Sequence, residues 1–268
     1  MLNTLYHTVL GRCILKILTF PAVSKMSGLF LSTPVSRLYI KRFIAKNNID
    51  MNDFENKKYK SFNEFFTRKI LDRKRTIDPH PNSLISPCDG YLTVCDIDCN
   101  SSLNIKGISY TVDELFKNKA VENTYHGGKC LIFRLTPTDY HRYIYPDRGT
   151  KSENTHIKGV FHTVRPVALQ AHPVFKTNSR EYTTLHTENF GDILFMEVGA
   201  MLVGKICNHH GTHSFERGDE KGYFEFGGST IIMMLKKDIA SINKEIVSTS
   251  SVDGEYRVKL GEKIGTRI

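Results

Sequence analysis

The spacing of apolar residues changes at about residue 75 of the chain. Before that point apolar residues recur every three or four positions, which is the spacing of one face of a helix. Pro21 and Pro34 should interrupt this region, because proline is tolerated only in the first turn of a helix. Ser61 and Glu64 have the spacing of a capping box, which predicts a short helix beginning there. The region 1–75 is therefore predicted to be helical.

Beyond a proline-rich stop at residues 78–82, short runs of β-branched and aromatic residues predominate, and Gly, Pro, Asn and Asp separate them. One helical patch interrupts these runs at residues 112–118. Helices followed by many strands predict an α+β chain whose core is a mainly antiparallel β-sheet or sandwich. We expect a helical region at 1–75 and a β-rich domain at 76–268. The expected strands are residues 91–94, 129–135, 157–164, 180–186, 193–198, 201–207, 223–226 and 230–235.

The first 49 residues carry seven Lys or Arg and no acidic residue, which accounts for most of the formal net charge of +9. Such a segment favours an anionic partner, either nucleic acid or a membrane surface. Its apolar residues favour the membrane, because they would line one face of a helix that carries Arg12 and Lys16 on the other. The alternative is a helix packed on the protein's own core. The apolar face comprises Leu2, Leu5, Tyr6, Val9, Leu10, Cys13, Ile14, Ile17 and Leu18.

Three further features of the sequence bear on membrane spanning, on the cysteines and on metal binding. No uncharged apolar run approaches the roughly 18 residues that cross a bilayer, and Arg12 and Lys16 interrupt any signal-peptide core. The six cysteines form no Cys-x-x-Cys pair, so we expect them to be reduced thiols. The segment 207–213 offers one Cys and three His to a zinc ion, but it lacks a second ligand pair, and we expect no bound metal.

The candidate chemistry begins at Phe226-Gly227-Gly228-Ser229-Thr230, just before the apolar run 231–235. Two glycines leave the Gly228 carbonyl almost unshielded and allow the backbone to bend there. The Ser229 hydroxyl is then well placed to attack that carbonyl. The alternative is a tight turn that leads into a buried strand. A hydrolase serine is disfavoured, because no glycine stands two residues after Ser229 and no strand–turn–helix is expected.

Two other residues complete a set of groups for nucleophilic chemistry. Asp89 lies in a turn, Ser86–Gly90, and His141 lies in an aromatic-rich polar loop at 136–146. With Ser229 they supply an orienting carboxylate, a base and a nucleophile. For Asp89 the alternative role is the Asp-Gly turn itself, and for His141 it is an ordinary surface position.

Several blocks of the sequence coincide with those of one family. The chain resembles the phosphatidylserine decarboxylase proenzymes, which make their own pyruvoyl cofactor. The blocks span about residues 60–235 in the family's order, so the resemblance covers most of the chain. They are Ser61–Arg68, Ser86–Gly90, Asp139–Arg142, Val198–Ala200 with Val203-Gly204, and Phe226–Thr230.

The resemblance implies decarboxylation of phosphatidylserine to phosphatidylethanolamine and CO2, preceded by self-cleavage between Gly228 and Ser229. It implies a β chain of residues 1–228 and an α chain of residues 229–268 that remain together as a heterodimer, which can dimerise further. Ser229 would become the pyruvoyl group that condenses with the substrate amine. His141 would take the hydroxyl proton, and Asp89 would orient the imidazole and stabilise its charged form. Residues 76–268 would be the catalytic domain.

One position departs from the family pattern. Many members carry a second histidine three residues after the first, where this chain has Ile144. Either His141 serves both self-cleavage and product protonation, or another histidine helps. The candidates are His162, His172, His209 and His210.

The resemblance and the basic N-terminus together imply a peripheral protein on the cytoplasmic side of the cell membrane, with phosphatidylserine and an anionic surface as partners and no nucleic acid. Two rival functions stay open from the sequence. One is a pyruvoyl decarboxylase of a soluble amino acid, and the other is a non-catalytic basic module that binds membranes.

Overall fold

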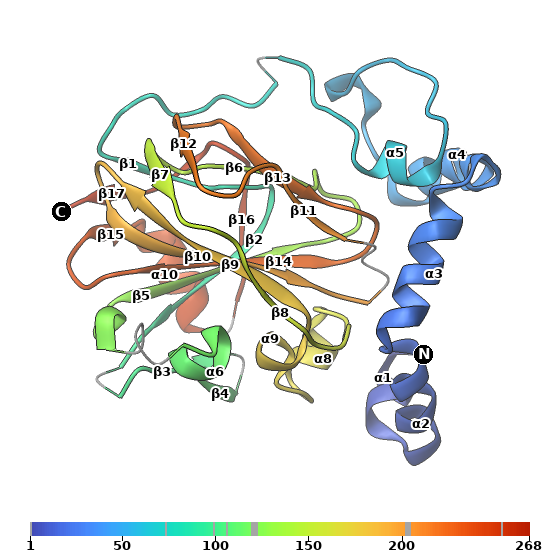
Figure 1. Cartoon of the computed structure of the whole chain (residues 1–268), viewed down its shortest axis with the longest axis horizontal. Coiled ribbons are helices and arrows are strands. Elements are labelled where there is room, and N and C mark those ends of the chain that lie inside the picture. Colours follow the sequence, from blue (N-terminus) through green and yellow to red (C-terminus); the bar gives the residue numbers. More distant parts are fainter. Residues whose placement is uncertain are drawn as a thin grey trace.

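A row of short helices lies along one side of a large β-sheet (Figure 1). The structure is a computed structural model that describes residues 2–72, 74–98, 100–105, 107–118, 123–201, 205–252 and 254–268. The N-terminal helices are α1 (Leu2–His7), α2 (Val9–Leu18), α3 (Pro21–Leu31), η1 (Pro34–Arg37), α4 (Leu38–Asn47), η2 (Met51–Asp53) and α5 (Phe62–Phe66). Further along the chain are α6 (Val112–Phe116), η3 (Asn123–Tyr125), α8 (Pro166–Leu169), α9 (Val174–Thr177) and α10 (Lys244–Ser251).

The two prolines start helices, as expected from their fixed backbone: Pro21 opens α3 and Pro34 opens η1. Ser61 caps α5 by accepting the Glu64 N–H, and this confirms the short helix. The capping box is only half formed, because the Glu64 carboxylate accepts from the backbone of Lys60 instead. The prediction of helix throughout 1–75 is too broad, since α4 ends at Asn47 and only η2 and α5 follow it in the described part of that range.

The single N-terminal amphipathic helix is also a wrong prediction. Thr8 adopts an extended conformation and accepts the Gly11 N–H at 3.0 Å, so α1 ends and α2 begins there. Leu5, Tyr6 and Leu15 are buried against the sheet domain. By contrast, Leu10 and Ile17 are 73% and 67% exposed. The segment therefore packs on the core with a few side chains and presents most of its predicted apolar face to solvent.

The sheet system confirms the α+β class with mainly antiparallel strands. The largest sheet has nine strands in the order β12-β7-β9-β10-β14-β5-β2-β16, with β8 paired to β9. Its strands are β2 (Gly90–Asp96), β5 (Lys129–Leu135), β7 (Gly149–Lys151), β8 (Thr155–Ile157), β9 (Arg180–Thr187), β10 (Gly191–Gly199), β12 (His213–Phe215), β14 (Ser229–Leu235) and β16 (Tyr256–Val258). Three smaller sheets contain β1 (Ser83–Ile85), β17 (Lys263–Arg267) and β15 (Ala240–Ile242); β11 (Ile206–Asn208), β13 (Glu220–Phe224) and β6 (Arg142–Ile144); and β3 (Ser102–Ile105) and β4 (Ile108–Thr111).

Strand β14 runs through the middle of the nine-stranded sheet, and all seven of its residues are buried. Successive side chains of a strand point to opposite faces. Ile231 and Met233 accordingly join the core under the two three-stranded sheets, while Ile232 and Met234 join the core under α6, α8 and α9 (Figure 1). The apolar run 231–235 is thus explained by a strand covered on both faces.

Most predicted strands are confirmed within a residue or two, and three need correction. The predicted strand 157–164 ends at Ile157, because the following loop packs its backbone against residues 177–179 through Gly159. The predicted strand 223–226 is β13, which begins at Glu220 and ends at Phe224. The predicted strand 201–207 is confirmed only at its end, where β11 begins at Ile206, because Met201 and Lys205 lie outside any strand. Residues 202–204, and with them the block Val203-Gly204, lie outside the described part of the chain. The division into regions 1–75 and 76–268 stays a prediction.

Two further findings concern the membrane and the thiols. No single described helix is both long and apolar enough to cross a bilayer, whereas α2 and α3 reach that length as a pair bent by 58°. Cys13, Cys88, Cys130 and Cys207 are free thiols, as predicted, and Cys99 lies outside the described residues.

Candidate functional site

Neighbouring strands bring the three predicted site residues to the same end of the nine-stranded sheet. Asp89 immediately precedes β2, His141 follows β5 by a short loop, and Ser229 is the first residue of β14. The strands β2, β5 and β14 are consecutive in the sheet, with Tyr91 opposite Arg134 and Leu135 opposite Ser229. The loop that carries His141 returns to this end of the sheet. The His141 carbonyl accepts the N–H of Phe224, five residues before Ser229, at 3.0 Å.

The segment before Ser229 has the bent backbone that the two glycines predicted. Gly227 has φ +145°, a conformation that side chains disfavour. Gly228 lies close to the 158–165 loop, because a Cβ added there would be 3.3 Å from Val164 Cγ2. Gly228 is partly exposed, whereas Ser229 is fully buried. The Ser229 Oγ has no hydrogen-bond partner among the described residues, which leaves the hydroxyl free to react.

His141 is fully buried, and its two ring nitrogens have different surroundings. Nδ1 lies 2.9 Å from the Asp139 carbonyl oxygen. A carbonyl can only accept, so Nδ1 carries the proton and Nε2 keeps its lone pair. Nε2 has no partner in the described part of the chain. Burial lowers the pKa of His141 to about 4, so the ring is neutral and able to act as a base at neutral pH.

Asp89 is held by a different partner from the one predicted. Its carboxylate accepts two hydrogen bonds from Arg75, at 3.0 Å and 2.6 Å, and one from the Leu260 N–H at 2.8 Å. Among the described contacts His141 is oriented by the Asp139 carbonyl instead, so the predicted orienting bond from Asp89 is not formed. The negative charge of Asp89 does favour a higher pKa at His141, and it therefore stabilises the imidazolium through space.

The block Ser61–Arg68 contains site residues that the sequence reasoning did not single out. Asn63 is buried, and its Oδ1 accepts the Phe226 N–H at 3.0 Å, while its Nδ2 donates to Ser32 Oγ. Phe66 lies on the His141 ring with centroids 4.1 Å apart. This block therefore holds both the His141 ring and Phe226, the residue just before the glycine pair. The one sequence feature that pointed to Asn63 and Phe66 was the resemblance of their block to the family.

Arg68 adds a buried cation near the site. Its guanidinium lies over the Phe54 and Phe65 rings and donates to the Phe65 carbonyl. Burial lowers the pKa of Arg68 to about 10. Its positive charge opposes protonation of His141 and so acts in the same direction as burial.

The other candidate histidines fall into two pairs. His162 and His172 stack at 4.9 Å between ring centroids, and Tyr6 OH lies 3.3 Å from His162 Nδ1. Burial lowers the pKa of His162 to about 4. His162 lies two residues before Val164, which approaches Gly228, so a short loop links this pair to the glycine segment before Ser229.

The second pair belongs to a separate polar cluster. His209 bonds to Glu220 at 2.6 Å, and His210 stacks on His213. In the described residues no three His, Cys, Asp or Glu side chains come together in a group able to hold a metal ion.

Comparison with known proteins identifies the family. The sequence model of the phosphatidylserine decarboxylase family matches residues 62–266. A phosphatidylserine decarboxylase proenzyme 2 of Clostridium acetobutylicum is 44% identical over 98% of this chain and 91% of its own length. Proenzymes of Clostridium botulinum and Ruminiclostridium cellulolyticum are each 42% identical, over 99% and 100% of this chain and 92% and 91% of their own lengths. The chain therefore belongs to the phosphatidylserine decarboxylase family, and the predicted class of enzyme is confirmed.

Proposed function

We propose that this enzyme decarboxylates phosphatidylserine to phosphatidylethanolamine and CO2, with a pyruvoyl group made from its own Ser229. The observation that carries the proposal is the buried, unpartnered Ser229 hydroxyl next to a glycine pair with positive φ at Gly227. A hydroxyl buried without a partner costs free energy. Ser229 and Thr230 both carry such a hydroxyl, but only that of Ser229 belongs to the residue joined to the Gly228 carbonyl, and this position supports a chemical role. Family membership supports the substrate named in the relatives.

The residues around Ser229 fit the formation of a pyruvoyl group at this position. Ser229 Oγ attacks the Gly228 carbonyl carbon, the peptide C–N bond breaks, and an ester joins Gly228 to the Ser229 side chain. Removal of the Ser229 Cα proton then expels the Gly228 carboxylate and leaves dehydroalanine. Water converts the dehydroalanine to a ketone and releases ammonia. The products are residues 1–228 and 229–268.

His141 is the base for this sequence of steps. The hydrogen bond from Nδ1 to Asp139 leaves Nε2 as the nitrogen that accepts the Ser229 proton. Asp89, neutralised on one side by Arg75, contributes a negative charge that stabilises the imidazolium as it forms. Once formed, the pyruvoyl group would supply an electron sink for the pair that the substrate releases as CO2 leaves. His141 can protonate the product carbon only after its Nε2 has taken up a proton from solvent.

A trapping experiment tests this function. Purified protein is incubated with phosphatidylserine vesicles and sodium cyanoborohydride, and intact mass is measured on both fragments. We expect the 229–268 fragment to gain the mass of the lipid amine, and headspace analysis to detect CO2 without the reductant. Turnover of free serine in place of the lipid would favour the soluble-substrate enzyme. An uncut chain that traps neither amine would contradict the proposal and favour a non-catalytic module.

We also propose that the enzyme is peripheral on the cytoplasmic, anionic face of the cell membrane. Large apolar side chains stand exposed on α2, α3 and α4, within the acid-free segment 1–49. Exposed apolar groups beside cations favour the boundary between headgroups and acyl chains. The exposed set includes Val9, Leu10, Ile17, Phe20, Met26, Leu29, Val35 and Leu38.

Membrane binding is tested on exposed positions only, because deleting residues 1–45 would also remove the buried Leu5, Tyr6 and Leu15. We expect Leu10→Gln with Ile17→Gln to reduce flotation with phosphatidylserine vesicles by roughly tenfold or more, since each substitution removes apolar burial. Val252→Gln, on a side chain 76% exposed and outside the N-terminal helices, is the matched control. Equal flotation of all variants would contradict this surface.

A further inference from the structure

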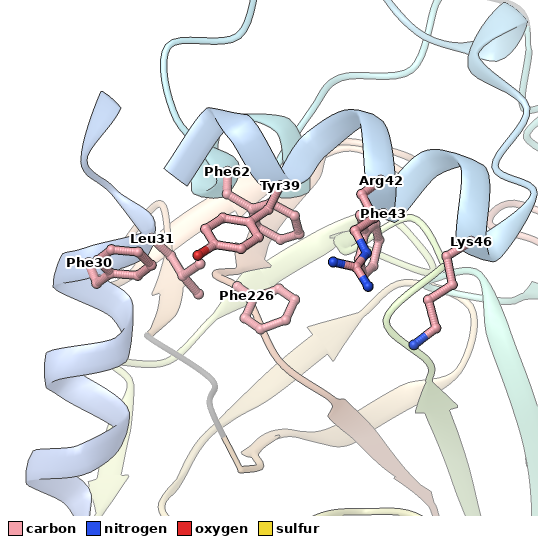
Figure 2. Close-up of a pocket in the computed structure, with 8 residues that line it drawn as sticks. All are labelled: Phe30, Leu31, Tyr39, Arg42, Phe43, Lys46, Phe62 and Phe226. Atoms are coloured by element: carbon pink, nitrogen blue, oxygen red, sulfur yellow. The ribbon is translucent and has the colours of Figure 1, made fainter. Parts of the chain in front are cut away.

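An open apolar groove lies beside the cleavage segment (Figure 2). It has a volume of about 330 Å³, which falls within the range of small-molecule sites. Its apolar wall consists of Phe30, Leu31, Tyr39, Phe43, Phe62 and Phe226. A second hollow of about 420 Å³ shares three of these residues and adds Met26 and Ser27, so the apolar surface continues along α3.

The groove wall leaves aromatic surface uncovered. Phe30 is 46% exposed and Tyr39 is 51% exposed. At the bottom of the groove Phe226 contacts Phe62 and Phe43, with ring centroids 5.0 Å and 6.4 Å away. The wall is thus anchored to the core at one end and open at the other. Such contiguous exposed apolar surface is typical of a binding site for an apolar ligand.

Two cations stand at one end of this apolar wall. Arg42 and Lys46 are one helical turn apart on α4, and Figure 2 shows both side chains extending toward the side of the helix where Phe226 lies. Neither forms an ion pair with a described residue, and no acid occurs before Asp50. Unpaired Arg and Lys together suit a phosphate group, since Arg offers a planar pair of donors and Lys a point charge.

The groove is within reach of the proposed reaction centre. Phe226 precedes Ser229 by three residues, so their Cα atoms are at most about 10 Å apart. In a diacyl glycerophospholipid the phosphodiester stands between the amine-bearing headgroup and the acyl chains. A headgroup at residue 229 would therefore place its phosphate and acyl chains on the groove side.

We propose that this groove holds one acyl chain of the glycerophospholipid substrate while Arg42 and Lys46 bind its phosphodiester. The assignment rests on the proposed function for the identity of the lipid. It makes α3 and α4 part of the substrate site as well as of the membrane surface. Selection of a lipid over free serine then comes from the groove, because only the lipid has the phosphate and the chain that it binds.

The test measures lipid binding without self-cleavage. The full chain carrying Ser229→Ala is titrated calorimetrically with monomeric dihexanoyl phosphatidylserine. We expect Arg42→Gln with Lys46→Gln to raise Kd roughly tenfold or more, since hydrogen bonds to a charged group are lost. Arg37→Gln with Lys41→Gln removes the same charge from neighbouring positions outside the groove and should change Kd by less than about twofold.

The acyl part is tested with a second pair of variants. Tyr39→Ala should weaken binding of dihexanoyl phosphatidylserine but not of glycerophosphoserine, which has the phosphodiester and no acyl chain. Val252→Ala, on a side chain 76% exposed and outside the N-terminal helices, is its control.

Each outcome is decisive. Equal effects of the two charge pairs would overturn the phosphate site, and unchanged lipid binding in Tyr39→Ala would overturn the acyl site. Dimerisation that Tyr39→Ala abolishes would assign the groove to a second copy of the chain and overturn the proposal. Failure of wild-type protein to cleave itself would instead refute the proposed function, and it would leave these binding measurements intact.

Discussion

Replacing Ser229 with alanine is expected to leave the chain as one polypeptide of 268 residues without decarboxylase activity. The substitution removes the only atom of residue 229 that can attack the Gly228 carbonyl. Because the pyruvoyl group comes from this side chain, the loss of activity should be complete rather than partial. Intact mass spectrometry of freshly purified protein measures the cleavage, and CO2 release measures the activity.

The neighbouring Thr230 provides a matched control. Thr230 Oγ1 is buried and, like Ser229 Oγ, has no hydrogen-bond partner among the described residues. Thr230→Ala removes an equivalent hydroxyl one position beyond the scissile bond and should cleave at the wild-type rate. Ser229→Thr keeps the nucleophilic oxygen and should still cleave, more slowly. Cleavage of the Ser229→Ala chain, or loss of cleavage in Thr230→Ala, would contradict the assigned nucleophile.

His141→Gln is expected to slow self-cleavage by about 10²–10⁴-fold, the usual contribution of a general base. In wild-type protein the first-order rate should be flat from neutral pH downward. It should then fall with a midpoint near pH 4, since burial lowers the pKa of His141 to about that value. The measurement is a time course of fragment formation across pH. An ordinary histidine midpoint near 6.5 would contradict the buried, neutral base.

The lowered pKa of His141 also predicts how the free energy of unfolding depends on pH. The folded-state pKa of His141 lies below the unfolded value, so the unfolded chain binds more protons between about pH 4 and pH 6.5. The free energy of unfolding should fall as pH decreases through that window, with a contribution from His141 on the order of 3 kcal/mol. His141→Gln should show a shallower dependence in chemical denaturation. His162→Gln is the comparison variant, because burial also lowers the pKa of His162 to about 4 while His141 remains.

Local patterns were sufficient for the regular elements. The runs rich in apolar and β-branched residues at 129–135 and 230–235 predicted β5 and β14, whose side chains are buried on both faces. Pro21 and Pro34 predicted breaks between helices, and Ser61 predicted a helix start, because their effect on the backbone depends only on neighbours a few residues away. The resemblance blocks also pointed to the candidate site residues before any distance was known.

The sequence by itself determined the α+β class, the family, the segment with the unshielded peptide bond and five strands of the central sheet, β2, β5, β9, β10 and β14, because these depend on short-range patterning. Only the tertiary structure decided which groups the candidate site residues contact. Arg75 rather than His141 binds Asp89, the Asp139 carbonyl sets the His141 tautomer, and Asn63 holds Phe226 across 163 positions of sequence. Each depends on which side chains burial brings together, and burial also lowers the pKa of His141. The spacing of residues along the chain does not show which distant side chains will lie in contact.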